Sequence, residues 1–118
     1  MPQPRDLSKR ARGAFGERLA ATTYRRRGAE ILDRNWRTST GELDLVVREG
    51  DVYVFCEVKT RRSRRYGSPL EAITPQKAAR IRRVADEWLR SNGLHGVTTR
   101  FDVVSIVGVE LDLVPMAF

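Results

Sequence analysis

The chain has almost none of the residues that form disulfide bonds or bind soft metals. Its 118 residues include one cysteine, Cys56, and one histidine, His95. A lone cysteine cannot form an internal disulfide, and together with one histidine it cannot complete a zinc site of nitrogen and sulfur ligands. Any metal ion bound by this protein is therefore expected to be held by oxygen.

Long apolar runs are also missing. No stretch approaches the roughly 18 apolar residues that span a bilayer, and the start, MPQPRDLSKRARG, lacks the apolar core of a signal peptide. We therefore expect a cytoplasmic protein that makes no membrane contact. The length predicts a single domain over residues 1–118, within which residues 1–8 are expected to form a flexible N-terminal arm.

Positive charge is present in excess. The chain has 22 Lys and Arg against 15 Asp and Glu, a net charge of +7. An extended polyanion is the expected partner class, and arginine suits bidentate contacts with phosphate. The same excess also fits a solvated arginine surface, so charge alone names no reaction.

Apolar periodicity predicts a helix, three strands, a second helix and one or two further strands, which is an α/β arrangement. The first helix is expected over residues 9–27, with Ala11, Phe15, Leu19 and Thr22 on its apolar stripe and Gly28 as its stop. Thr74 and Pro75 are typical of the start of the second helix, which Gly93 ends. The expected strands are residues 29–36, 43–47, 52–58, 100–107 and, at an edge, 109–114.

The second and third strands are expected to form a tight hairpin that carries the chemistry. If Gly50 and Asp51 are its two turn residues, the numbers of facing residues sum to 101, so Asp44 faces Glu57. Alternation of side chains then puts Lys59 on the same face as Glu57. Directly opposed Cβ atoms lie about 4.5 to 5.5 Å apart, which lets both carboxylates share one divalent cation.

Magnesium or manganese would relieve the repulsion between the two carboxylates, and a lysine beside the metal can orient a water or neutralise a phosphate. Two carboxylates, a divalent metal ion and a lysine together suit the hydrolysis of phosphodiester bonds. The alternative is that Asp44, Glu57 and Lys59 form a salt-bridged patch at the rim of a sheet. The flanking runs LDLVV and VYVFCEV are apolar on both faces, which favours the middle of a covered sheet and makes charged residues there notable.

Glu17 is a further candidate metal ligand. It interrupts a helical stripe of small and apolar residues, Gly13, Ala20, Ala21 and Tyr24, so it can face the sheet. The alternative is a solvated helix glutamate.

The GE of residues 16–17, the GELDL of residues 41–45 and the EVK of residues 57–59 resemble, in combination, the YraN-type family of small bacterial proteins. That family is similar to archaeal Holliday junction resolvases within the PD-(D/E)XK nuclease superfamily. The resemblance implies a restriction-endonuclease-like core, with a mixed central sheet flanked by helices. The resemblance also implies that Asp44, Glu57 and Lys59 are the catalytic residues and that Glu17 is the acidic residue that the first helix contributes to the site. It implies that Gln76 or Lys77, on the second helix, lies near the site. Leu43 stands where the superfamily often has a proline.

Two basic segments are candidate nucleic-acid contacts. TRRSRRY directly follows the strand that carries Glu57 and supplies Arg61, Arg62, Arg64 and Arg65. Lys77 and Arg80 on the second helix can continue the track. The alternative is a solvated arginine face beside a basic loop at residues 60–69.

Two functions are therefore open. One is an Mg²⁺- or Mn²⁺-dependent endonuclease acting on DNA, including branched or junction DNA, with Asp44, Glu57 and Glu17 as metal ligands. The other is a binding module of the same fold that holds DNA or RNA without cleaving it. DNA is the preferred partner, and a junction with two-fold symmetry would call for a homodimer.

Overall fold

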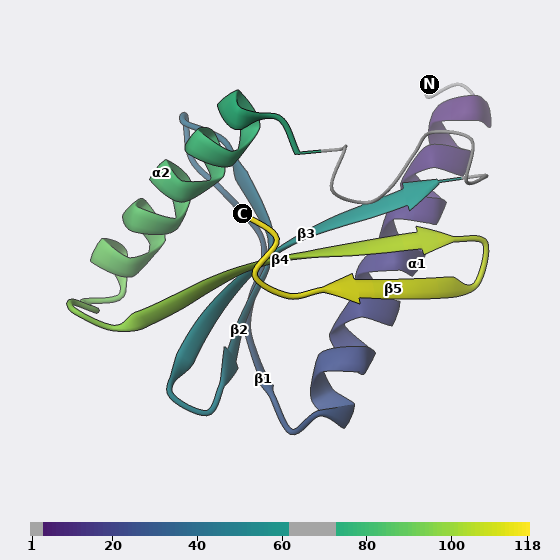
Figure 1. Cartoon of the computed structure of the whole chain (residues 1–118). Coiled ribbons are helices and arrows are strands. Elements are labelled where there is room, and N and C mark those ends of the chain that lie inside the picture. Colours follow the sequence, from purple (N-terminus) through teal and green to yellow (C-terminus); the bar gives the residue numbers. More distant parts are fainter. Residues whose placement is uncertain (1–3, 62–72) are drawn as a thin grey trace.

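The computed structural model describes residues 4–61 and 73–118, with side chains from residue 13 onward (Figure 1). The elements follow one another in the predicted order, and the edge strand is present. They are α1 (Pro4–Arg26), β1 (Glu30–Arg37), β2 (Glu42–Glu49), β3 (Val52–Arg61), α2 (Pro75–Ser91), β4 (Thr98–Val107) and β5 (Glu110–Val114).

The five strands form one mixed sheet in the order β1-β2-β3-β4-β5. Neighbours are antiparallel except β3 and β4, which run parallel. Parallel neighbours need a long crossover, and α2 lies in the chain between these two strands. Figure 1 shows α1 and α2 on different sides of the sheet, so β2 and β3 are covered on both faces. The predicted mixed sheet flanked by helices is confirmed.

The face of the sheet under α1 is lined by the alternate side chains of β2, β3 and β4 that include Leu45, Cys56 and Val104. From α1 the buried residues are Ala20, Ala21 and Tyr24. Of the predicted apolar stripe, Leu19 is half-buried and packs against this core, whereas Phe15 is 38% exposed, so its expected burial was wrong. The small side chains face the sheet because they let the helix backbone lie close to it.

The face under α2 is lined by Val46, Phe55 and Phe101, against which α2 packs Val84 and Trp88. The helix begins as predicted, since Thr74 Oγ1 accepts a hydrogen bond from the Lys77 backbone N–H and proline follows at the first position. A defined start fixes which residues of its first turn point toward β3.

Two predicted boundaries need correction. α1 begins at Pro4 rather than at residue 9, so most of the expected arm is helical. Proline is tolerated in the first turn because no hydrogen bond from its nitrogen is needed there, and no helix breaker follows before Gly13. β3 continues to Arg61, so Thr60 and Arg61 belong to the strand rather than to the basic loop. In the described part of the chain, no helix is long and apolar enough to cross a membrane.

Candidate functional site

The hairpin of β2 and β3 has the predicted register. Its pairs run from Glu49 opposite Val52 to Leu45 opposite Cys56, and the numbers of each pair sum to 101. Gly50 adopts a positive φ of 62°, which the tight turn requires. Asp44 and Glu57 directly follow the last of these pairs, so the turn brings the two carboxylates close together at the end of the paired region.

The Asp44 carboxylate is held against β3. Its Oδ2 accepts a hydrogen bond of 2.8 Å from the backbone N–H of Val58. Burial and the negative charge of Glu57 together raise the pKa of Asp44 to about 8, although the hydrogen bond from Val58 acts in the opposite direction. Asp44 therefore ionises less readily than a free aspartate, because it is largely removed from water and lies beside a second carboxylate.

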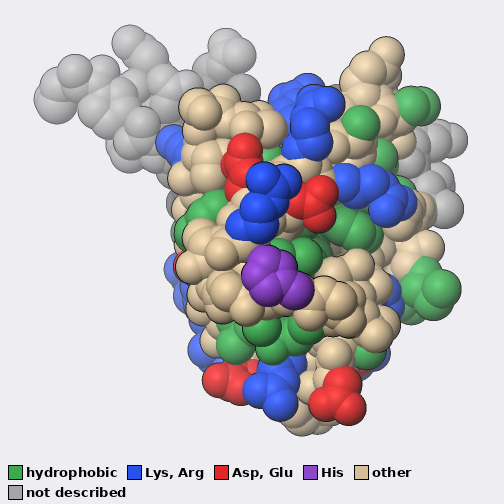
Figure 2. Space-filling model, turned by 90° about the vertical axis from the view of Figure 1, so that its left-hand side faces the viewer, with side chains coloured by type: hydrophobic (Ala, Val, Ile, Leu, Met, Phe, Trp, Pro, Cys, Tyr) green, Lys and Arg blue, Asp and Glu red, His purple; other side chains and the backbone are tan. Residues whose placement is uncertain are grey.

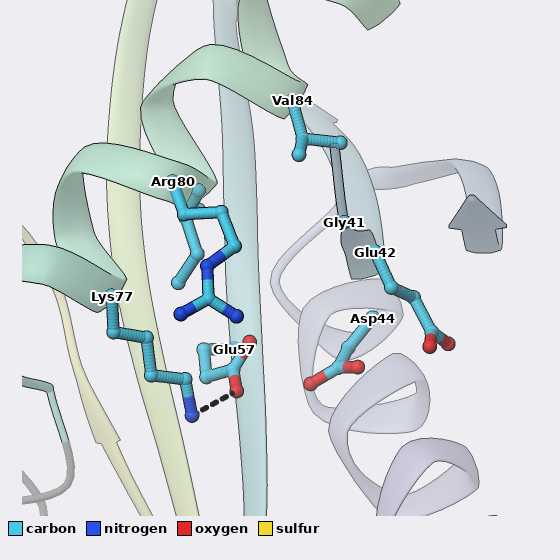
Figure 3. A pocket seen from close by; sticks show the side chains of 8 residues that line it. Gly41, Glu42, Asp44, Glu57, Lys77, Arg80 and Val84 are labelled. Carbon is cyan, nitrogen blue, oxygen red and sulfur yellow. Dashed lines mark ion pairs between the residues drawn. The ribbon is translucent and has the colours of Figure 1, made fainter. Parts of the chain in front are cut away.

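Glu57 has one strong partner, which comes from α2. Its Oε1 lies 2.9 Å from Lys77 Nζ, and the side chains are 12% and 28% exposed, respectively. This ion pair lies in a pocket of about 200 Å³ between the β2–β3 hairpin and α2 (Figure 3). The residues that line the pocket include Glu42, Asp44, Glu57, Lys77, Arg80 and Val84. Figure 3 shows the Lys77 and Arg80 side chains reaching from α2 toward Glu57, with Asp44 beside it.

Lys59 belongs to the same group of charges. It lies two residues after Glu57 on β3 and therefore on the same face of the sheet. Burial lowers the pKa of Lys59, and the positive charge of Lys77 lowers it further, whereas Glu57 and Asp44 act in the opposite direction. A lysine with a lowered pKa can more easily release its proton.

Glu17 lies near this group without joining it. Its Oε2 accepts a 3.0 Å hydrogen bond from Asn35 Nδ2, and its charge is the smallest of the causes that raise the pKa of Asp44. Gly16 allows this approach, because a Cβ there would overlap Thr60 Cγ2 and lie 3.2 Å from Ile106 Cδ1. Within residues 4–61 and 73–118, no three acidic, histidine or cysteine side chains are arranged to hold a metal ion. The metal role of Glu17 stays a prediction.

The remaining predicted residues lie in different places. Gln76 is exposed on the first turn of α2, next to Lys77. Arg61 is half-buried at the end of β3. Arg62, Arg64 and Arg65 lie outside the described residues. Cys56 is buried on the α1 face, opposite Glu57, as predicted for a small core residue.

Sequence reasoning missed the residues that hold the rim of the site. Thr38 and Thr40, in the turn between β1 and β2, each donate a 2.6 Å hydrogen bond to the carboxylate of Glu87 on α2. These bonds fix the turn against the helix. Gly41, in the same turn, also lies close to α2, because a Cβ at this position would come within 3.3 Å of the Arg80 and Val84 side chains. The threonines around the glycine were a detectable sign of a turn, but their partner on α2 was not.

Asn35 was missed as well. It adopts a positive φ of 50°, a conformation that asparagine tolerates better than most residues, and from there it reaches Glu17. A register shift of β1 between Ile31 and Asp33 precedes it. An asparagine within a predicted strand was the one available signal.

Comparison with known proteins identifies the family. Residues 16–106 match the model of a family described as "Uncharacterised protein family UPF0102". A UPF0102 protein of Rhodococcus jostii (strain RHA1) is 57% identical over 97 residues, which cover 82% of each chain. One from Frankia casuarinae is 54% identical over 99 residues, covering 84% of each chain. One from Nocardioides sp. (strain ATCC BAA-499 / JS614) is 52% identical over 99 residues, covering 84% of this chain and 80% of its own. The chain therefore belongs to the UPF0102 family, in agreement with the YraN-type resemblance of its sequence.

Proposed function

We propose that this protein is a nuclease-like, divalent-metal-dependent phosphodiesterase that acts on DNA, built on a restriction-endonuclease-like core. The observation that carries the proposal is the proximity of Asp44 and Glu57 in one pocket at the end of the hairpin, where burial and the charge of Glu57 raise the pKa of Asp44 to about 8. Such a strong perturbation in a pocket is typical of functional sites.

The donor set suits a hard cation. Carboxylate oxygens are the ligands that Mg²⁺ and Mn²⁺ prefer, and a cation at Asp44 and Glu57 would relieve the repulsion between them. Asp44 and Glu57 would hold it, with Glu17 as the next nearest acidic group in the proposal. When bound, a divalent cation supplies positive charge that stabilises the phosphate in the transition state and makes a bound water more acidic.

The chain's own cations have distinct tasks in this proposal. Lys59 Nζ, with its lowered pKa, holds a water near Glu57 and can exchange a proton with it. Lys77 and Arg80 reach into the pocket from α2, where they can contact phosphate oxygens. Arg61 extends the same positive charge to the end of β3.

The surface around α2 carries more positive than negative charge. In Figure 2, Lys and Arg side chains gather over the upper part of this face, with acidic side chains between them. The exposed cations of α2 are Arg80, Arg82, Arg83 and Arg90. A surface of this kind can follow a phosphate backbone beside the site without reading its sequence.

A cleavage assay tests the proposal. Full-length protein is incubated with Mn²⁺ and a four-way DNA junction, and in parallel with linear duplex, single-stranded DNA and RNA of equal length. We expect Mn²⁺-dependent cutting of DNA that falls at least about a hundredfold in Asp44→Asn. Asparagine keeps the size of Asp44 and can still accept the Val58 hydrogen bond, so folding is preserved. Cutting that is unchanged in Asp44→Asn would contradict the assignment of the site.

A second candidate function is a non-catalytic module that binds DNA or RNA. The ion pair between Glu57 and Lys77 favours it, because one of the two carboxylates is already neutralised by the protein itself. The same assay separates the candidates. Binding of nucleic acid without metal-dependent cutting of any substrate would support the module and end the enzyme proposal.

A further inference from the structure

The Glu57 carboxylate already has a cationic partner in the protein. Lys77 Nζ lies 2.9 Å from Glu57 Oε1, and the glutamate side chain is only 12% exposed. A carboxylate this buried gains much from a nearby positive charge. The ammonium group of Lys77 therefore occupies a position beside one of the two oxygen donors that a divalent cation would use.

Lys77 is anchored at its backbone and adjustable at its tip. Its N–H donates to Thr74 Oγ1 at the start of α2, which fixes where the side chain begins. The side chain is 28% exposed, so its outer end has a route to solvent. Four rotatable methylene groups let a lysine ammonium move by several ångströms without a change in the backbone.

An ammonium group and a divalent cation repel each other strongly at such a distance. A cation that entered between Asp44 and Glu57 would also neutralise Glu57. The ammonium group of Lys77 would then lose the attraction that holds it beside this carboxylate. Arg80 lines the same pocket, so a phosphate bound beside Arg80 would also lie close to Lys77.

We propose that Lys77 is a displaceable counter-ion: it neutralises Glu57 in the metal-free protein, and a divalent cation moves its ammonium group from Glu57 to a phosphate of bound nucleic acid. This rests on the proposed function, since it needs the cation to bind Asp44 and Glu57. It follows that Lys77 weakens metal binding when nucleic acid is absent. It also follows that metal and nucleic acid strengthen each other's binding, because coupling between two ligands is reciprocal.

The first test measures Mn²⁺ affinity by titration calorimetry at fixed pH, on the full chain without nucleic acid. Lys77→Met keeps the length of the side chain and removes the charge, so we expect it to bind Mn²⁺ roughly tenfold tighter than the unchanged protein. The matched control is Arg80→Met, which removes a positive charge from the same pocket and the same helix but leaves the Lys77–Glu57 pair. For this variant we expect a change below about threefold.

The outcomes separate this proposal from the proposed function. Equal Mn²⁺ affinity in the unchanged protein and in Lys77→Met overturns the counter-ion role and leaves the metal site intact. Failure of both to bind Mn²⁺ overturns the metal site and the counter-ion role together. Lys77→Gln serves as a second variant if thermal melting reports that Lys77→Met does not fold.

The second test asks whether the ammonium group moves to phosphate. Binding to a duplex with hydrolysis-resistant phosphorothioate linkages is measured over a range of salt concentrations, with and without Mn²⁺. With Mn²⁺, we expect Lys77→Met to reduce the slope of log K against log salt by about one, the loss of one phosphate contact. Without Mn²⁺ the slope should not change, because Lys77 is then paired with Glu57. An equal change in both conditions would overturn the displacement.

Discussion

Two carboxylates, the fully buried Asp102 and the half-buried Asp44, lie at nearly the same level of the sheet but on opposite faces, and they differ in how many hydrogen bonds and positive charges balance them. Asp102 on β4 pairs in register with Cys56, one residue before Glu57, and is completely buried on the α1 side. Its carboxylate accepts four hydrogen bonds, at 2.7 to 3.2 Å, from Tyr24, twice from Arg100, and from the Met116 N–H. Every lone pair that faces the core has a donor.

Asp44, at the pocket under α2, has far less support. Its carboxylate accepts a hydrogen bond from the Val58 N–H, and a second carboxylate, Glu57, lies close enough to raise its pKa. The outcome is a pKa raised to about 8. Asp102 has enough hydrogen-bond donors and positive charge around it to stabilise the fold, whereas Asp44 has few. This contrast indicates that Asp102 has a structural role and that Asp44 lowers the stability of the fold.

The largest effect is expected at the compensated carboxylate. Asp102→Ala would leave the Tyr24 hydroxyl without its buried acceptor and would remove one of the two carboxylates that pair with Arg100, so we expect the free energy of unfolding to fall by about 3–5 kcal/mol. Urea denaturation measures it.

Asp44→Ala provides the comparison for that experiment. It removes a carboxylate that the fold accommodates poorly, so it should cost much less than Asp102→Ala. If the two variants lose stability equally, the contrast between the two faces is wrong.

The next effect concerns the close approach of α1 to the sheet beside the site. Gly16→Ala would place a Cβ against Thr60 Cγ2, a branched side chain with little freedom to move, and near Ile106. We expect a loss of about 1–3 kcal/mol of stability, from overpacking, and a shift of Glu17 away from Asp44. Thermal melting measures the first, and metal affinity the second.

Gly13→Ala is the matched control, one turn earlier in the same helix. No atom lies within 4 Å of a Cβ at that position. The variant should therefore be stabilising, by up to about 1 kcal/mol, because alanine favours a helix more than glycine does. A loss of stability in both variants would show that helix packing at Gly16 is not the cause.

Local signals in the sequence predicted the parts of the site that lie on a single hairpin or at one helix end. A two-residue turn at Gly50 and Asp51 sets the register, and the register sets which residue faces Glu57. Thr74 followed by Pro75 fixes the start of α2 in the same way. Each of these depends only on residues close together in the chain.

Contacts between distant elements were not predictable in this way. The approach of Lys77 to Glu57 depends on how α2 lies across β3, and the hydrogen bond from Asn35 to Glu17 depends on an unusual backbone conformation in β1. For α1, the stripe of Ala20, Ala21 and Tyr24 around Glu17 was predicted correctly, whereas Phe15 was wrongly expected to be buried, because large apolar residues indicate burial in general and here small ones decide how close the helix comes.

The smallest expected effect measures most directly how poorly the ionised carboxylate of Asp44 is stabilised in the folded protein. Because the pKa of Asp44 is raised from 3.8 to about 8, the folded protein binds more protons than the unfolded chain between these pH values. Stability should therefore fall as pH rises through that window. Asp44→Asn removes this titration and keeps an acceptor for Val58, so in EDTA it should be more stable than the unchanged protein at pH 9, by at least about 1 kcal/mol, and nearly equal to it below pH 4. Urea denaturation at several pH values measures the difference, with Asp86→Asn on α2 as a control for the removal of an exposed carboxylate. If the difference between Asp44→Asn and the unchanged protein does not grow with pH, Asp44 is compensated as well as Asp102 is, and the two faces of the sheet are alike.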